Sequence, residues 1–219
     1  MPVSISSPLH FVNDVGMFAW DRSRKSCAHR TKFCSANCYN KKLYKTFPNM
    51  ATQESKLEFV WDHMDYGNIA SQMRRARKQT KRVRGCTRGE NFNNFNDVVK
   101  VYYVALVNPD TVFWLPTRAW RNEELKQHIE KTIMKLPNAR VQASMDPSNT
   151  LAEWHMVVDA GWSTLFFGDN DMTVTPTGHN MIKCQKTHKG LNKGLKGVCA
   201  TCKRGCFSAN QNHVHLKQH

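Results

Sequence analysis

Three cysteines lie within twelve residues near the N-terminus, at Cys27, Cys34 and Cys38. Cysteine is usually buried, and the polar, basic sequence around these three does not suggest an apolar core. Metal ligation is the chemistry that this pattern favours. Three thiolates can bind three irons of a 4Fe–4S cluster and leave the fourth iron open to a substrate. They can also hold zinc together with a fourth ligand such as His29 or Cys86.

A second cysteine group lies near the C-terminus, at Cys184, Cys199, Cys202 and Cys206. Many lysines and four glycines accompany it, with little apolar sequence, so metal binding would supply the folding energy of this segment. Four thiolates make a complete site that is closed to substrate, and either zinc or an Fe–S cluster fits. The separation into a trio and a quartet argues against a framework of disulfides, as does the length of the chain.

The composition indicates a soluble protein with a polyanionic partner. The chain has 219 residues, 32 Lys plus Arg against 17 Asp plus Glu, and a formal charge of +15. Nucleic acid is the first candidate partner, although some cations could serve solubility or surround an anionic cluster. No apolar run is long enough to span a membrane, and Met1–Ser4 does not begin a secretory signal. We therefore expect a cytoplasmic protein.

Strand-like and helical segments alternate along the chain, and this alternation predicts an α/β fold with a parallel sheet. Strands are predicted at 15–20, 81–86, 111–116, 140–144, 163–167 and 180–183. Helices are predicted at 40–47, 52–64, 68–80, 95–107, 122–136 and 150–160. About six βα units fall short of a closed eight-stranded barrel, so we expect a partial (βα) barrel. The predicted organisation is a partial barrel over 1–178, a cysteine-rich metal segment over 179–208 and a disordered tail over 209–219.

Two of the predicted helices have an inward face that can be named from apolar spacing. Helix 122–136 has Leu125, Ile129, Ile133 and Leu136 on one face. Segment 95–107 has a face made of Phe95, Val98, Val99, Tyr102, Tyr103 and Leu106, although its β-branched residues leave a strand as the alternative. Seven cations between Arg74 and Arg84 lie on the basic helix 68–80 and its exit.

Parallel α/β folds carry their chemistry at the carboxyl ends of the strands. The trio follows the first predicted strand, Gly89 and Glu90 follow the second, and Ser144 and Asp146 follow the fourth. We take these four residues as candidates for binding a cofactor. The alternatives are that Glu90 is an exposed turn carboxylate and that Ser144 and Asp146 cap the next helix. Cys86 ends the second strand, either as a buried free thiol or as a fourth thiolate of the first site.

A cysteine loop after the first strand and a Gly-Glu turn after the second resemble the layout of radical S-adenosylmethionine enzymes. The sequence also resembles a phage-encoded, cysteine-rich family known from mycobacteriophages as the gene-product-eighty-eight family. The matching pieces are Cys27 with Cys34-x-x-x-Cys38-Tyr39, the Gly89-Glu90-x-Phe92 turn, the run Phe113-Trp114-Leu115-Pro116-Thr117-Arg118, and the C-terminal quartet.

The resemblance implies a 4Fe–4S cluster on Cys27, Cys34 and Cys38 and a location in the cytoplasm of an infected host. The open iron would bind the amino and carboxylate groups of S-adenosylmethionine, with backbone near Gly89 and Glu90 receiving the amino group. An electron from the cluster would then cleave the sulfonium to a 5′-deoxyadenosyl radical. The cysteine gaps are six and three residues here, where the usual motif has three and two, so the cluster loop would follow a different path.

Two functions from different classes follow from these patterns. The first is an iron–sulfur enzyme of the radical type that acts on a nucleic acid or another large anion. The second is a non-catalytic nucleic-acid-binding or host-takeover protein in which both metal sites are structural. The number of thiolates at the first site separates them, since three leave an open position and four close it.

Overall fold

An eight-stranded sheet runs through the computed structural model, which describes residues 9–12, 16–46, 49–63, 65–76, 80–169, 171–185, 187, 198–209 and 212–217. In spatial order its strands are β1 (Leu9–Val12), β2 (Met17–Trp20), β3 (Arg82–Gly85), β4 (Val112–Thr117), β5 (Ala139–Met145), β6 (Ser163–Gly168), β8 (His213–Lys217) and β7 (Met181–Lys183). β1 is antiparallel to β2, and the other seven strands are mutually parallel. The predicted α/β class is confirmed, with seven parallel strands where about six were expected.

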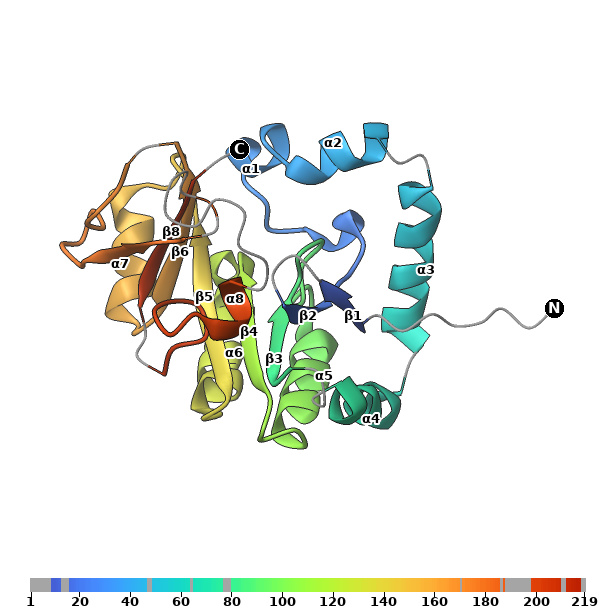
Figure 1. Ribbon diagram of the computed structural model, residues 1–219. Helices are drawn as coiled ribbons and strands as arrows, with labels where there is room; N and C mark the ends of the chain where they lie inside the picture. The colour runs from blue at the N-terminus through green and yellow to red at the C-terminus, as the bar shows by residue number, and fades with distance from the viewer. Residues whose placement is uncertain are drawn as a thin grey trace.

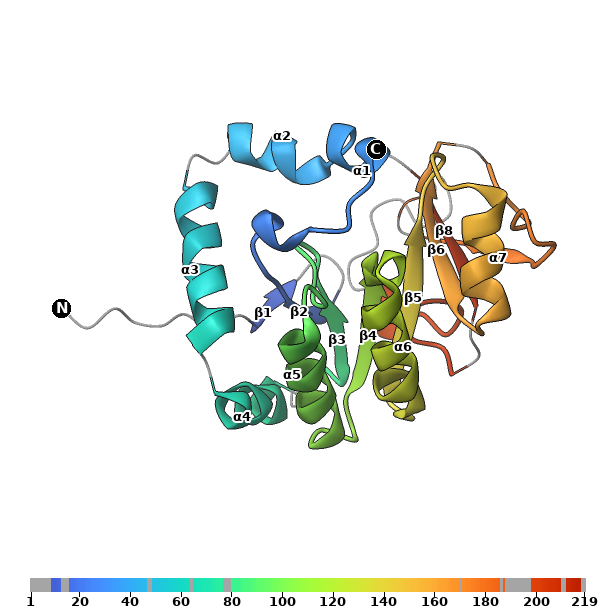
Figure 2. The same cartoon turned by 180° about the vertical axis from the view of Figure 1, so that it is seen from behind.

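Helices alternate with the parallel strands and cover the sheet unequally. The helices are α1 (Lys32–Ala36), α2 (Tyr39–Thr46), α3 (Met50–His63), α4 (Tyr66–Ala76), α5 (Phe95–Leu106), α6 (Glu123–Lys131), α7 (Leu151–Asp159) and α8 (Val198–Thr201). Figure 2 shows α5, α6 and α7 in front of the sheet, whereas α8 lies in front of the opposite face in Figure 1. We call that opposite face the tail face. α1 and α2 pass above the strands, at the top of Figure 1.

Apolar residues from alternate strand positions pack on the two faces of the sheet. The larger cluster lies under the helices and includes Val83 and Leu115. The smaller cluster lies on the tail face and consists of Met17, Trp114, Leu165 and Val214, with three cysteines of the quartet packed against it. Successive side chains of a strand point to opposite faces, so Arg84, next to Val83, belongs to the tail face. Within the described residues, no helix is long and apolar enough to cross a bilayer.

The predicted strands are all present, and two strands were missed, β1 and β8. Residues 209–219 were expected to be disordered, but His213–Lys217 form β8, which is inserted between β6 and β7. Val214 and His215 are buried in this position. A short strand with three polar residues has little local signal, and pairing with two neighbours stabilises it. The tail therefore belongs to the same sheet as the rest of the chain.

The inward face was predicted correctly for one helix and only in part for another. In α6 and the turn after it, Leu125, Ile129, Ile133 and Leu136 are all buried, as expected. Segment 95–107 is indeed helical, but Phe95 is 59% exposed and Tyr103 is 40% exposed. Val98 is buried as expected, and the other buried residues of α5 are Asp97, Lys100, Val101, Val104 and Ala105. The helix has two apolar faces. The face with the smaller valine side chains packs on the sheet, and the face with Phe95 and Tyr103 is exposed.

Candidate functional site

A cleft of about 450 Å³ lies at the carboxyl ends of the strands. Cys27, Cys34 and Cys38 line it on one side, together with His29 and Asn40. The strand side contributes residues from β3, β4, β5, β6 and β8 or from the turns that follow them: Arg84, Cys86, Thr87, Gly89, Glu90, Pro116, Thr117, Arg118, Ser144, Leu165, Phe167, Leu216 and Lys217. A cleft of this size accepts a small molecule or a single group of a larger one.

The three cysteines of the first group face the same cleft. Cys27 follows a 3₁₀ turn at Arg24–Ser26, Cys34 lies in α1, and Cys38 directly precedes α2. Burial raises the pKa of the Cys27 thiol to about 12, and the nearby charges of Glu90, Cys34 and Cys38 add to this rise. The thiols are therefore close enough to repel one another as thiolates. A bound cation or cluster would relieve that repulsion, because metals bind the deprotonated form.

A hydrogen-bond chain fixes the loop that carries Cys34. Thr31 caps α1, and its Oγ1 accepts the backbone N–H of Cys34 at 2.9 Å. The same hydroxyl donates to Asp146 Oδ2 at 2.6 Å. Asp146 is fully buried and forms an ion pair of 2.8 Å with Arg118. Asp146 after β5 and Arg118 after β4 thus position a cysteine that is distant from both of them in the sequence.

Gly89 allows the turn after β3 to pack directly against the loop before Cys27. Its φ is +80°, and a Cβ atom there would lie 2.6 Å from the carbonyl oxygen of Ser23. A side chain at this position would therefore be strained and would also clash. A hydrogen bond joins the same two segments, because the N–H of Glu90 donates to Ser26 Oγ at 2.8 Å.

The carboxylate of Glu90 connects β3 to β4. It accepts hydrogen bonds from Thr117 Oγ1 at 2.8 Å, the N–H of Arg118 at 2.9 Å and the N–H of Phe92 at 3.2 Å. Burial raises its pKa, while these donors act in the opposite direction. With only 6% of its surface exposed, Glu90 is not the exposed turn carboxylate that was the alternative expectation.

Asp146 and Ser144 do not cap the next helix, because Thr150 caps α7 through a capping box with Glu153. The carboxylate of Asp146 is occupied by Thr31, Arg118 and Ser148. Ser144 lines the cleft, and its backbone carbonyl accepts from Arg118 at 3.1 Å. Of the four candidate cofactor residues, Gly89 and Asp146 thus shape the cleft mainly through protein contacts, and Ser144 lies on its wall.

Cys86 also lines the cleft, beside Cys27. Its backbone has a φ of 45°, the left-handed region that non-glycine residues rarely adopt. Burial raises its pKa well above the ordinary value, and the charges of Glu90, Asp21 and Cys27 add to the rise. Strain of this kind is typical of functional positions. The structure thus places a fourth thiol next to the trio.

The C-terminal quartet forms a second sulfur-rich group on the tail face. Burial raises the pKa of Cys206, and the charges of Cys184, Cys199 and Cys202 act in the same direction. Arg82 on β3 holds this segment by donating to the carbonyl of Cys202 at 2.9 Å and to that of Cys199. Cys184, Cys199 and Cys206 pack against the same apolar cluster, so the segment that carries the quartet is docked on the sheet.

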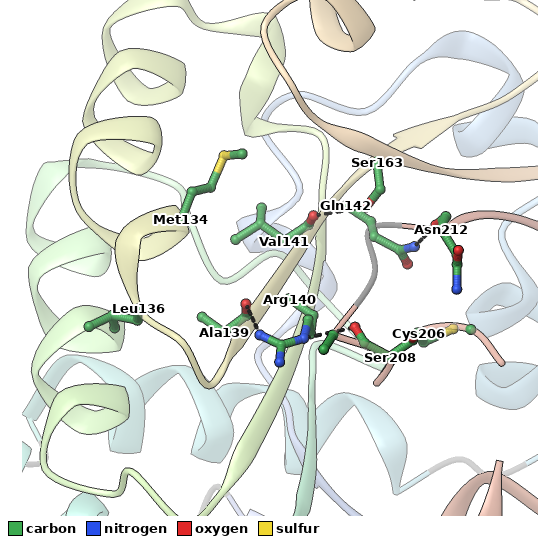
Figure 3. Close-up of a pocket in the computed structure, with 12 residues that line it drawn as sticks. Met134, Leu136, Ala139, Arg140, Val141, Gln142, Ser163, Cys206, Ser208 and Asn212 are labelled. Atoms are coloured by element: carbon green, nitrogen blue, oxygen red, sulfur yellow. Dashed lines mark hydrogen bonds between the residues drawn. The ribbon is translucent and has the colours of Figure 1, made fainter. Parts of the chain in front are cut away.

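Figure 3 shows how the residues after the quartet dock on β5 around a small pocket of about 90 Å³. Arg140 donates to the carbonyl of Ser208 at 2.8 Å and to that of Ala139 at 2.9 Å. Gln142 donates to the carbonyl of Asn212 at 2.8 Å. These polar contacts to backbone carbonyls join the tail to the sheet, so the pocket is a packing crevice between them.

The described side chains do not provide a preformed site for a single metal ion, since no three His, Cys, Asp or Glu groups converge on one point. No disulfide joins any of the eight cysteines, all of which lie in the described part of the chain. The thiol ligands of a 4Fe–4S cluster bind different irons, so they need not converge as tightly as zinc ligands. The chemistry of both donor sets fits a cluster.

Several cleft residues were not found from the sequence. Arg84, Asn40, Leu165, Phe167, Leu216 and Lys217 line the cleft, although no motif marks them. One signal was available for Arg84, because side chains alternate between faces along the predicted strand 81–86, which would put Arg84 on the same face as Cys86. For Leu216 and Lys217 no signal existed, since the strand that carries them was not recognised.

Comparison with known proteins relates the chain to a family. The model of a protein family described as gene product 88 matches residues 12–206, which include both cysteine groups and every strand from β2 to β7. No curated protein and no solved structure matches the chain.

Proposed function

The chain belongs to the gene product 88 family, and we propose that it is an iron–sulfur protein of the radical S-adenosylmethionine type, built on a partial barrel. The observation that carries the proposal is the position of the trio. Cys27, Cys34 and Cys38 face an open cleft at the carboxyl ends of parallel strands, where α/β enzymes place their chemistry.

In this proposal the trio holds a 4Fe–4S cluster. When bound with S-adenosylmethionine, such a cluster supplies the one-electron chemistry that protein side chains cannot. The chain's own residues position the ligands. Thr31 fixes the backbone of Cys34, and Asp146 fixes Thr31. These contacts support a loop that is preorganised for ligation.

We propose that S-adenosylmethionine binds between the trio and the Gly89–Glu90 turn, with Ser144 on the adjoining wall. Gly89 brings this turn against the loop that precedes Cys27. Glu90 and Asp146 act on the cofactor site indirectly, because their carboxylates hold the turn and the cysteine loop in place. Exclusion of water falls to the apolar residues of the cleft, which include Pro116, Leu165 and Phe167.

For the C-terminal quartet we propose a second Fe–S cluster or a zinc ion. For the partner we propose nucleic acid, because exposed cations surround the loop and helices that carry the trio. Lys25, Arg30, Lys32, Lys41 and Lys45 are all exposed there. Their density supports a polyanionic partner near the cleft.

One observation favours the non-catalytic alternative. Cys86 lies in the cleft beside Cys27 and could act as a fourth ligand. Four thiolates would close the first site and make it structural. The role of Cys86 therefore separates the two functions.

The test is anaerobic purification of the wild type and of C27A, C34A, C38A and C86A, with iron and sulfide analysis and visible and electron paramagnetic resonance spectra. We expect each trio variant to lose one cluster's iron, and C86A to keep it. S-adenosylmethionine should change the spectrum of the reduced wild type and of C86A. Loss of iron in C86A, with no spectral response to S-adenosylmethionine, would establish the closed structural site instead. A colourless wild type without iron would refute both cluster assignments.

A further inference from the structure

Arg84 lies in the cleft without a carboxylate partner among the described residues. It is on the tail face of β3, and its guanidinium stacks over the ring of Trp114 on β4 at 4.7 Å. Its Nε atom is buried and has no hydrogen-bond partner in the described part of the chain. A buried guanidinium nitrogen without an acceptor is costly, because it has given up its hydrogen bonds to water.

Three other arginines at this end of the sheet, all with little exposed side-chain surface, are paired with carboxylates. Arg22 bonds Asp97 at 2.6 Å, Arg88 bonds Asp21 at 3.1 Å, and Arg118 bonds Asp146 at 2.8 Å. The chain thus provides carboxylates for the buried arginines around the cleft, but none within ion-pair distance of Arg84 in the described part. This contrast points to an acceptor that comes from outside the protein.

The cleft as a whole carries an excess of positive charge. Its lining includes Arg24, Arg30, Arg84 and Lys217, in addition to Arg118, which is paired with Asp146. Among the described residues that line it, the single carboxylate is Glu90, which already accepts three hydrogen bonds from the protein. An anion that enters the cleft would therefore meet a favourable field, and Arg84 is a cation with free hydrogen-bonding capacity there.

The surroundings of Arg84 also define the rest of the ligand. Leu165, Phe167, Leu216 and Pro116 give the cleft an apolar wall. Two further buried polar atoms in the lining lack partners among the described residues, His29 Nε2 and Asn40 Oδ1. Asn40 is only 4% exposed, so its unpaired oxygen is available to a donor on a bound molecule.

We propose that Arg84 binds the carboxylate or phosphate of a small organic anion whose apolar or aromatic body lies against this wall. The inference does not depend on a cluster at the trio. The volume of about 450 Å³ suits a molecule of nucleotide size or smaller. Arg84 would make a charge-assisted hydrogen bond to the anion, which is stronger than a neutral one.

The experiment compares charged and neutral probes of the same shape on the full-length protein as purified. Adenosine 5′-monophosphate is paired with adenosine, and benzoate is paired with benzamide. Binding is followed by calorimetry and by tryptophan fluorescence, because Trp114 lies directly under Arg84. We expect at least one anion to bind about tenfold or more tightly than its neutral partner, the factor of one charge-assisted hydrogen bond.

R84Q should abolish this preference, and R84K should retain part of it. R75Q, at an exposed position of α4, is the matched control and should behave as wild type. Circular dichroism and melting curves show whether R84Q is folded, and R84K provides the test if it is not. Equal binding of charged and neutral probes by the wild type, or an unchanged preference in R84K and R84Q, would overturn the proposal.

A different role for Arg84 gives a different result. Its charge also acts on Cys206 of the quartet, where it lowers the thiol pKa against the larger effect of burial. If Arg84 serves only that site, R84Q will lower the metal content of the quartet and leave the anion preference intact, which would also overturn the proposal. Iron is measured separately, so a protein without iron would refute the proposed function while the anion preference still stands.

Discussion

The hydroxyl of Thr31 donates to Asp146 across 2.6 Å and joins the first cysteine loop to the end of β5. The same oxygen accepts the N–H of Cys34, so one side chain connects a candidate metal ligand to a buried carboxylate. Asp146 is in turn held by Arg118 at the end of β4. The geometry of the cysteine loop therefore depends on residues from two distant strands.

T31V should weaken both this connection and metal loading. The variant keeps the side-chain shape but removes the cap of α1, which costs about 1 kcal/mol. We expect faster amide hydrogen exchange over 27–38 and a lower iron content. T150V is the matched control, since Thr150 caps α7 by the same geometry away from the cleft. Equal iron loss in both variants would contradict a specific role for Thr31.

D146N should destabilise the protein in a pH-dependent way. Burial alone would raise the pKa of Asp146, but the charge of Arg118 and the bonds from Ser148 and Thr31 outweigh it and lower the pKa. This stabilisation is present above the ordinary Asp pKa of about 4 and is lost as the pH falls through the lowered value. Breaking the buried pair costs about 3 kcal/mol at neutral pH.

Urea unfolding of the wild type and D146N at several pH values measures this difference. The gap in unfolding free energy should be largest near neutral pH and should narrow in acid, where the wild-type carboxylate becomes protonated. A gap that stays constant down to about pH 3 would show that the ion pair with Arg118 is not its cause.

Metal binding by the quartet should stabilise both the segment that carries the four cysteines and the strand β8 that follows it. Cys199 and Cys202 lie between β7 and β8, and β8 supplies Leu216 and Lys217 to the cleft. C199S or C202S should therefore make the chain beyond about residue 184 sensitive to protease and should lower anion binding in the cleft. Unchanged proteolysis in both variants would show that the quartet is not needed for folding of the tail.

The basic surface should divide into two groups with different effects on nucleic-acid binding. Lys32, Lys41 and Lys45 lie on α1 and α2 near the cleft, whereas Arg74 and Arg75 lie on α4. Replacing the first three with Gln should reduce the dependence of log K on log salt by about 0.9 for each phosphate of duplex DNA that is no longer neutralised. Binding is measured with single- and double-stranded DNA and RNA across a salt series.

The pair Arg74 and Arg75, also changed to Gln, serves as the comparison and should affect affinity without affecting activity at the cleft. Weak binding that does not change with salt for all four polymers would refute the nucleic-acid partner.

Arg82 and Arg84 were grouped with these helix cations by sequence. They are turned to the tail face, where Arg82 holds the quartet and Arg84 enters the cleft, so they do not belong to the outer surface.

Local spacing in the sequence determined the class of the fold and the groups that could hold metal. The alternation of apolar segments predicted the parallel strands, because strand and helix periodicity are written in neighbouring residues. The cysteine spacings predicted two separate thiol groups. The trio lines one cleft, and Cys184, Cys199 and Cys206 pack against one apolar cluster on the tail face. The strand-end rule predicted that Gly89, Glu90, Ser144 and Asp146 share one edge of the sheet. The first three line the same cleft, whereas Asp146 is not among its lining residues.

Tertiary structure alone decided how those groups are used. Three features could not be predicted from neighbouring residues. They are the insertion of β8 between β6 and β7, the left-handed backbone of Cys86 at the cleft, and the hydrogen bonds that Glu90 and Asp146 accept from other parts of the chain. The sequence also does not predict that the buried Nε of Arg84 has no hydrogen-bond partner in the described part of the chain. Each depends on which distant segments pack together and on how many buried polar groups that packing leaves unpaired, and these are properties of the folded chain.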